Sequence, residues 1–193
     1  MVYQPKYDYL NDEKELKPII DEHKRLGSLI EARDSDSASI KLNLSRAENE
    51  LKHAEAAYKI SQNDYLKKEL ELLPTDSFYS GVISNAYYAL FFAAKSILIK
   101  EKIITKSPNI HKATLDAFSY YLILNGKLDV EILLLYQSTI IKADALLGLF
   151  VSEKEKRVEF TYKTLPDANK APAKESLENA SKFIMTIKKI VIS

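Results

Sequence analysis

Apolar side chains recur every three or four residues along most of this chain, which is the spacing of one face of an α-helix. The spacing predicts helices over residues 44–70, 78–102, 109–124, 129–160 and 174–192. No stretch sustains the alternation of apolar and polar residues that a half-buried strand shows. The pattern therefore predicts an all-α fold, an up-and-down bundle of four to five helices.

Capping residues indicate where two of these helices begin. Ser45, followed by Glu48 three residues later, has the spacing of a capping box and predicts a helix start near residue 44. Pro74 ends that helix because the residue before a proline avoids the α conformation. Asp76 or Ser77 is then expected to cap the next helix.

The first 43 residues are more polar than the rest. Apolar positions within 14–32 predict one short helix, and the segment RDSDSAS at 33–39 has the composition of a turn or linker. The chain is thus expected to consist of an N-terminal polar, helical arm, residues 1–43, and a helical bundle, residues 44–193.

The least polar stretch is SNAYYALFFAAKSIL, residues 84–98. It is apolar around most of the helix circumference, and its alanines allow close packing of neighbouring helices. Lys95, Ser96 and Lys100 interrupt the apolar run, which is shorter than the roughly 18 residues of a membrane span. The stretch is therefore predicted to be the central core helix, and no membrane association is expected.

Composition narrows the chemistry. The chain has 28 Lys and Arg against 27 Asp and Glu, so contact with nucleic acid would need a local basic patch. There is no cysteine, which excludes disulfides and thiolate metal sites. His23, His53 and His111 lie far apart, which argues against a zinc site, and no metal or cofactor is expected. The N-terminus lacks a secretory signal pattern, so a cytoplasmic protein is expected.

One motif weakly resembles a metal-binding site. Gly27-Ser28 and Asp34-x-Asp36 are similar to the Gly-Ser and Asp-x-Asp pair of polymerase-β-type nucleotidyltransferases. The spacing is too short, and no apolar strand precedes the glycine. A capped turn explains these residues better.

Arg46 and His53 form a second candidate. An arginine can hold a phosphate while a histidine takes a proton from a ribose 2′-hydroxyl, which is the chemistry of metal-independent RNases. Their separation of seven residues also equals two turns of any amphipathic helix, so ordinary surface positions remain the alternative.

A basic segment and a mixed-charge segment complete the candidates. Residues 95–112 carry five lysines around His111, a composition that suits phosphate but also the solvated ends of helices. The segment EKEKRVEFTY, residues 153–162, places Arg157 and Tyr162 at the expected end of the fourth helix.

The order of several short blocks resembles the HEPN superfamily, a nucleotide-binding domain of higher eukaryotes and prokaryotes. The resemblance covers residues 44–192, and its most specific element is Tyr87-Tyr88-Ala89-x-Phe91 followed by Ala93-Ala94-Lys95. The other blocks are RAENELKHAEAAY, IHKATLDAF, GKLD, RVEFTY and ESLENASKFI. The resemblance implies a helical bundle that is often a homodimer and is often encoded beside a minimal nucleotidyltransferase in toxin–antitoxin pairs.

The chain departs from the family pattern at several positions. Members with the tyrosine pair commonly have Arg where Asn85 stands and His where Phe92 stands. Thr161 replaces an acidic residue between Arg157 and Tyr162, and no Arg-x4–6-His motif lies near the fourth helix. The arm and a longer segment at 130–156 are additions.

These observations predict a non-catalytic nucleotide- or RNA-binding bundle, a homodimer or the partner of a nucleotidyltransferase in a toxin–antitoxin or defence system. One alternative is a metal-independent RNase toxin, with Arg157 holding phosphate and His111 or His53 as base. Another is a structural dimerisation module, so whether the chain is an enzyme stays open. The candidate binding residues are Asn85, Tyr87, Tyr88, Lys106, His111, Lys112, Arg157 and Tyr162.

Overall fold

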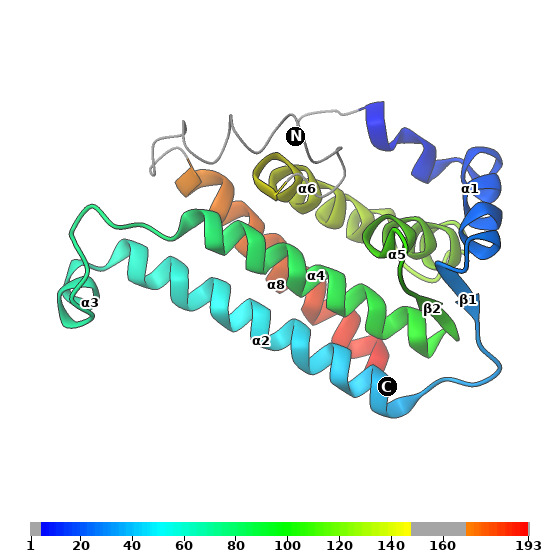
Figure 1. Cartoon of the computed structure of the whole chain (residues 1–193), viewed down its shortest axis with the longest axis horizontal. Helices are drawn as coiled ribbons and strands as arrows, with labels where there is room; N and C mark the ends of the chain where they lie inside the picture. The colour runs from blue at the N-terminus through cyan, green and yellow to red at the C-terminus, as the bar shows by residue number, and fades with distance from the viewer. Residues whose placement is uncertain (1–4, 148–168, 193) are drawn as a thin grey trace.

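The structure is a computed structural model of the whole chain, and it describes residues 5–147 and 169–192 (Figure 1). The elements are the 3₁₀ helix η1 (Pro5–Asn11), α1 (Glu13–Arg25), β1 (Leu29–Glu31), α2 (Ser37–Gln62), α3 (Asp64–Glu69), α4 (Tyr79–Lys100), β2 (Ile103–Thr105), α5 (Ile110–Phe118), the π-helical turn η2 (Ser119–Ile123), α6 (Val130–Leu147) and α8 (Lys170–Ile192). The predicted all-α helical bundle is confirmed.

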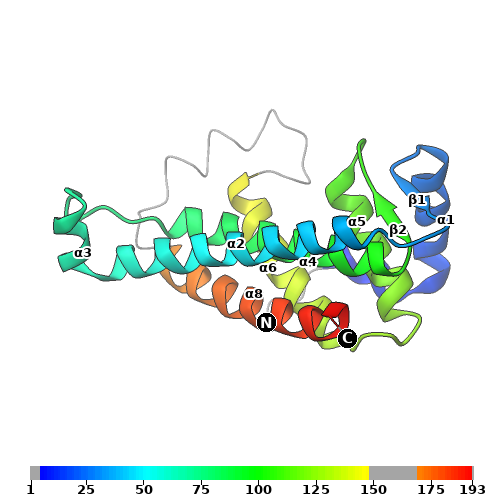
Figure 2. The same cartoon turned by 90° about the horizontal axis from the view of Figure 1, so that it is seen from below.

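Helix α4 is the centre of the bundle, as its composition predicts. It contacts α2, α5, α6 and α8, and α2, α4 and α8 run alongside one another over most of their lengths (Figures 1 and 2). By length and composition α4 would be long enough to cross a membrane, but 72% of its most apolar window is buried inside the protein. The apolar surface of α4 is thus used for packing against the other helices.

An aromatic cluster closes the core where α5, α6 and α8 meet. Phe118 lies edge-to-face with Tyr136, with ring centroids 5.7 Å apart, and Phe183 lies 5.4 Å from Phe118 and 5.5 Å from Tyr136. All three side chains are fully buried. Such pairs add to the stabilisation that burial of the rings itself gives.

The arm residues pack at one end of the bundle, against α5 and η2 (Figure 1). Leu10, Leu16 and Ile20 are almost completely buried and belong to the same core as α4. β1 pairs with β2 as a small antiparallel sheet in which Ile30 lies opposite Ile104. The sequence did not predict this sheet because strands of three residues are too short to show alternation.

The predicted start of α2 is wrong. Ser45 is an exposed residue within the helix, whereas the N-cap is Asp36, whose side chain accepts hydrogen bonds from the amides of Ala38 and Ser39. Asp is as good an N-cap as Ser, and Asp36 adds one negative charge at the positive end of the helix dipole. Part of the predicted linker is therefore the first turn of α2.

Two other helix ends also differ from the prediction. The long helix breaks at Asn63, which ends α2 and caps α3 by accepting hydrogen bonds from the amides of Tyr65 and Leu66. α4 begins after Phe78 with no side-chain cap, because the Asp76 carboxylate instead accepts a hydrogen bond from the Leu73 amide in the preceding loop.

Candidate functional site

One side of α4 is only partly covered by its neighbours. Asn85, Tyr88, Phe92 and Lys95 follow one another at steps of three, four and three residues and are half-buried, whereas most of the helix around them is buried. These four residues, called the α4 stripe below, share one helix face. Arg46 of α2 lies against Phe92, so α2 approaches the stripe from one side.

His111, near the start of α5, approaches the stripe from the other side. Its Nδ1 lies 2.7 Å from the hydroxyl of Tyr87. Its ring centroid lies 4.6 Å from that of Phe91 and 6.1 Å from that of Tyr88. Its Nε2 has no hydrogen-bond partner among residues 5–147 and 169–192. The ring is therefore held by one nitrogen and by aromatic contacts, with the other nitrogen available.

The contact between Tyr87 and His111 permits two proton arrangements. The phenol donates to Nδ1, which leaves Nε2–H as a donor, or Nδ1–H donates to the phenol oxygen, which leaves Nε2 as an acceptor. Tyr87 is completely buried, and that burial raises its pKa far above the ordinary value, so the phenol stays protonated. Burial, and then the charge of Lys95, lower the pKa of His111, which favours a neutral imidazole at neutral pH.

Two cations lie at the stripe without an acidic partner among residues 5–147 and 169–192. The ammonium of Lys95 lies 5.7 Å from the ring centroid of Phe91, and the guanidinium of Arg46 lies 5.6 Å from that of Phe92. Burial, and then the charge of Arg46, lower the pKa of Lys95. No carboxylate in the described part of the chain forms an ion pair with either cation. The two like charges therefore repel each other, and an anion between them would relieve this repulsion.

The other lysines of the 95–112 segment serve different contacts. Lys112 forms a 2.6 Å ion pair with Asp116, and Lys100 donates to the carbonyl of Ile190 at the end of α8. Lys106 is exposed after β2, and its amide donates to the Ser28 carbonyl. The structure thus brings Asn85, Tyr88, Lys95 and His111 together at the α4 stripe. Lys106 and Lys112 make their contacts elsewhere, with Ser28 and Asp116.

Arg46 and His53, the candidates from the first predicted bundle helix, both lie on α2. His53 is on the outer face of α2 with a side chain 68% exposed and only a long 3.9 Å contact to Glu50. Arg46, by contrast, contacts the α4 stripe. Arg157 and Tyr162 lie outside the described residues.

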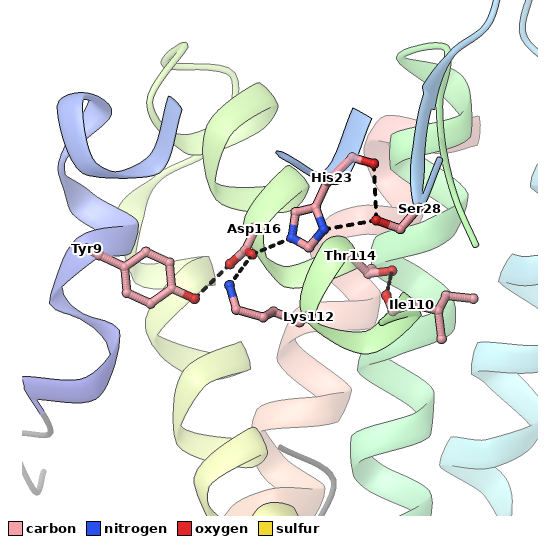
Figure 3. Close-up of polar contacts among 7 residues, drawn as sticks. All are labelled: Tyr9, His23, Ser28, Ile110, Lys112, Thr114 and Asp116. Carbon is pink, nitrogen blue, oxygen red and sulfur yellow. Dashed lines mark hydrogen bonds and ion pairs between the residues drawn. The ribbon is translucent and has the colours of Figure 1, made fainter. Parts of the chain in front are cut away.

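Sequence reasoning missed a buried polar network between the arm and α5 (Figure 3). The side chain of Asp116 is completely buried and accepts a 2.7 Å hydrogen bond from the Tyr9 hydroxyl. Its second oxygen lies 2.8 Å from Nε2 of His23 and 2.6 Å from the ammonium of Lys112. A buried carboxylate requires such partners because desolvation of an unpaired charge is costly.

Ser28 completes this network at the other nitrogen of His23. Its Oγ lies 3.0 Å from Nδ1 and 3.2 Å from the carbonyl oxygen of His23 (Figure 3). The order Ser28, His23, Asp116 is similar to a hydrolytic triad, but Ser28 and Asp116 are completely buried, so a substrate has no access. The network fastens the arm to the bundle.

The weak metal-binding motif also has a structural explanation. Ser28 belongs to the buried network, and Asp36 caps α2. Across residues 5–147 and 169–192, no group of three or more His, Asp or Glu side chains is arranged to hold a metal ion.

Comparisons with known proteins do not identify a family. No protein-family model matches the chain, and neither the curated proteins nor the solved structures contain a significant match.

Proposed function

We propose that this chain is a HEPN-like helical bundle whose α4 stripe, together with Arg46 and His111, binds a nucleotide or single-stranded RNA without cleaving it. The observation that carries the proposal is the pair of cations, Arg46 and Lys95, held over Phe92 and Phe91 with no carboxylate partner in the described residues.

Aromatic rings beside cations that have no carboxylate partner in the described part of the chain suit the two parts of a nucleotide. A base stacks on an aromatic side chain whatever its identity, and a cation neutralises the phosphate. Tyr88 is half-buried at the stripe and offers a ring next to His111, while Lys95 and Arg46 offer the charge. A phosphate there would be attracted by both cations, and this attraction offsets their mutual repulsion.

The family resemblance supplies the remaining parts of the proposal. It suggests a cytoplasmic homodimer, or a partner for a minimal nucleotidyltransferase, in a toxin–antitoxin or defence setting. It also suggests absence of cleavage, because Asn85 and Phe92 stand where related sequences commonly carry basic residues.

The test measures binding of a fluorescent single-stranded RNA of about 12 nucleotides by anisotropy, in EDTA and at about 0.1 M salt. Each lost phosphate contact reduces the slope of log affinity against log salt concentration by about 0.7. At about 0.1 M salt, this corresponds to about a fivefold loss of affinity. The double substitution Arg46→Ala with Lys95→Met should therefore weaken binding about 25-fold. The control, Lys17→Ala with Lys174→Ala, removes two exposed lysines from α1 and α8. Equal binding by both double variants would contradict the proposal.

A metal-independent RNase is the second candidate, and His111 is the observation that favours it. A neutral imidazole with an available Nε2 can accept a proton from a 2′-hydroxyl when Nδ1–H donates to Tyr87. The same RNA incubated in EDTA should stay intact under the binding proposal. Cleavage that disappears in His111→Ala, with binding retained, would establish the RNase instead.

A further inference from the structure

The exposed side of α4 is open towards the start of the helix and closed towards its end. At the steps of three and four residues that define the α4 stripe, Gly81 precedes Asn85 and Ile99 follows Lys95. Gly81 is exposed, with no described neighbour within 4 Å of the position that a Cβ would take. Ile99, by contrast, is only 7% exposed. The stripe therefore ends at Lys95 and continues past Asn85 onto an open surface.

Neighbouring elements close the stripe at Lys95. Figures 1 and 2 show α5, β2 and the first turns of α2 around the C-terminal part of α4, and all three elements contact this helix. The side chains of residues 96–99, directly after Lys95, are all buried. A strand that lies along the stripe thus has no exposed surface of α4 to follow beyond Lys95, and it leaves the helix at the Asn85 end.

The groups that can hold an anion gather at this closed end. The ammonium of Lys95 lies 5.7 Å from the ring centroid of Phe91, and the ring centroid of His111 lies 4.6 Å from the same point. The guanidinium of Arg46 lies over Phe92, whose ring centroid is 5.3 Å from that of Phe91. Three polar groups, one each from α2, α4 and α5, therefore meet at the last exposed turn of the stripe.

The charge at the closed end matches a terminal phosphate better than an internal one. A phosphodiester within a strand carries one negative charge, whereas a terminal phosphate monoester carries about −1.5 to −2 near neutral pH. Arg46 and Lys95 supply two positive charges, with no carboxylate partner in the part of the chain that the structure describes. His111 adds Nε2–H as a donor when the Tyr87 phenol donates to Nδ1. These three donor groups suit the three free oxygens of a monoester.

We infer that the α4 stripe binds the end of an RNA strand, with a terminal phosphate monoester at the closed end and the remaining nucleotides leading past Asn85. Arg46, Lys95 and His111 hold the phosphate. The inference rests on the proposed function, which it deepens by naming the kind of phosphate and the direction in which the strand leaves. An internal phosphodiester fits less well, because the strand continues on both sides of it and α4 is closed on one side. A monoester has the same chemistry at a 5′ or a 3′ end, so the experiment includes both.

The experiment compares the ends of one RNA with the full chain. The RNA carries a 5′-phosphate or a 5′-hydroxyl with the fluorophore at its 3′ end, or a 3′-phosphate or a 3′-hydroxyl with the fluorophore at its 5′ end. A monoester brings about one more negative charge than a diester, so at about 0.1 M salt the wild type should bind a phosphorylated end about fivefold more tightly than the matching hydroxyl end. Arg46→Ala with Lys95→Met should bind both ends equally. The control, Lys17→Ala with Lys174→Ala, should keep the preference.

The outcomes separate the terminal phosphate from RNA binding itself. A preference that the double variant loses supports the inference, and the end that shows it, 5′ or 3′, is the end that the stripe accepts. If the wild type binds phosphorylated and hydroxyl ends equally, the inference is wrong while the proposed function stands. If the double variant keeps the preference, the phosphate is held elsewhere and the inference is overturned. If the wild type binds none of these RNAs, both are wrong.

Discussion

Two histidines stand in opposite surroundings on the two sides of α5. His23 of the arm is buried and has both ring nitrogens within hydrogen-bond distance of partners, Asp116 and Ser28. His111 is half-buried, has one nitrogen bonded, and faces Lys95, a cation without an acidic partner in the described residues. The buried charge of the first cluster is fully paired, whereas the positive charge of the second has no acidic partner within the described ranges.

The difference separates a structural role from a binding role. A buried polar group contributes to folding when its partners are complete, and removal of one partner leaves the others unsatisfied. A half-exposed cation beside another cation contributes little to folding and favours an arriving anion. Mutations in the first cluster should therefore lower stability, whereas mutations in the second cluster should weaken binding.

Asp116→Ala should have the largest effect. It leaves His23, Tyr9 and Lys112 without their shared acceptor, and breaking a buried ion pair typically costs about 3–5 kcal/mol of unfolding free energy. Urea unfolding should show this loss. Asp21→Ala, at an exposed position of α1, is the control and should change stability by less than about 0.5 kcal/mol. Equal stability of the two variants would mean that the network does not fasten the arm.

Lys95→Met should act in the opposite direction. The substitution keeps much of the side-chain volume and removes a charge whose pKa is lowered by burial and by Arg46, so the folded state should gain about 0.5–1 kcal/mol after allowance for its partial exposure. RNA affinity should fall about fivefold at about 0.1 M salt. Thermal unfolding and anisotropy on the same samples measure both. A loss of stability would show that Lys95 is structural.

The bundle and its central helix follow from local patterns. The composition of residues 84–98 predicts a core helix. The half-exposed side of that helix contains Tyr88 and Lys95. His111 is recognisable as a histidine among lysines. The helix ends were predicted less well, because Ser45 and Asp36 both suit a cap and only packing decides between them.

The contacts that define the two clusters are not local. Asp116 meets His23 across 93 residues and Tyr9 across 107, and Arg46 meets Phe92 from another helix. The sequence paired Arg46 with His53 because they share a helix, whereas in the structure Arg46 contacts α4. A polar residue between Leu115 and Ala117, both buried, was the one available sign of the network.

The pH dependence of stability should distinguish His111 from an ordinary exposed histidine. The pKa of His111 in the folded protein lies below its ordinary value of about 6.5, so the unfolded chain takes up more protons as the pH falls. The contribution of His111 to stability is thus complete above about pH 7 and is lost as the pH falls below that value. Urea unfolding from pH about 7.5 to 5 should show a smaller decline for His111→Gln than for the wild type. Parallel curves would contradict the lowered pKa.

His53→Ala should have the smallest effect and so sharpens the comparison. The side chain is 68% exposed and its one charged neighbour, Glu50, is 3.9 Å away, so unfolding free energy should change by less than about 0.5 kcal/mol. The side chain of His53 lies on the outer face of α2, so its removal should change RNA affinity less than about twofold. Anisotropy titrations of His53→Ala and His111→Ala side by side provide the measurement. If His53→Ala weakened binding as much as Arg46→Ala, the binding centre would lie on α2 itself, and the α4 stripe would lose its role.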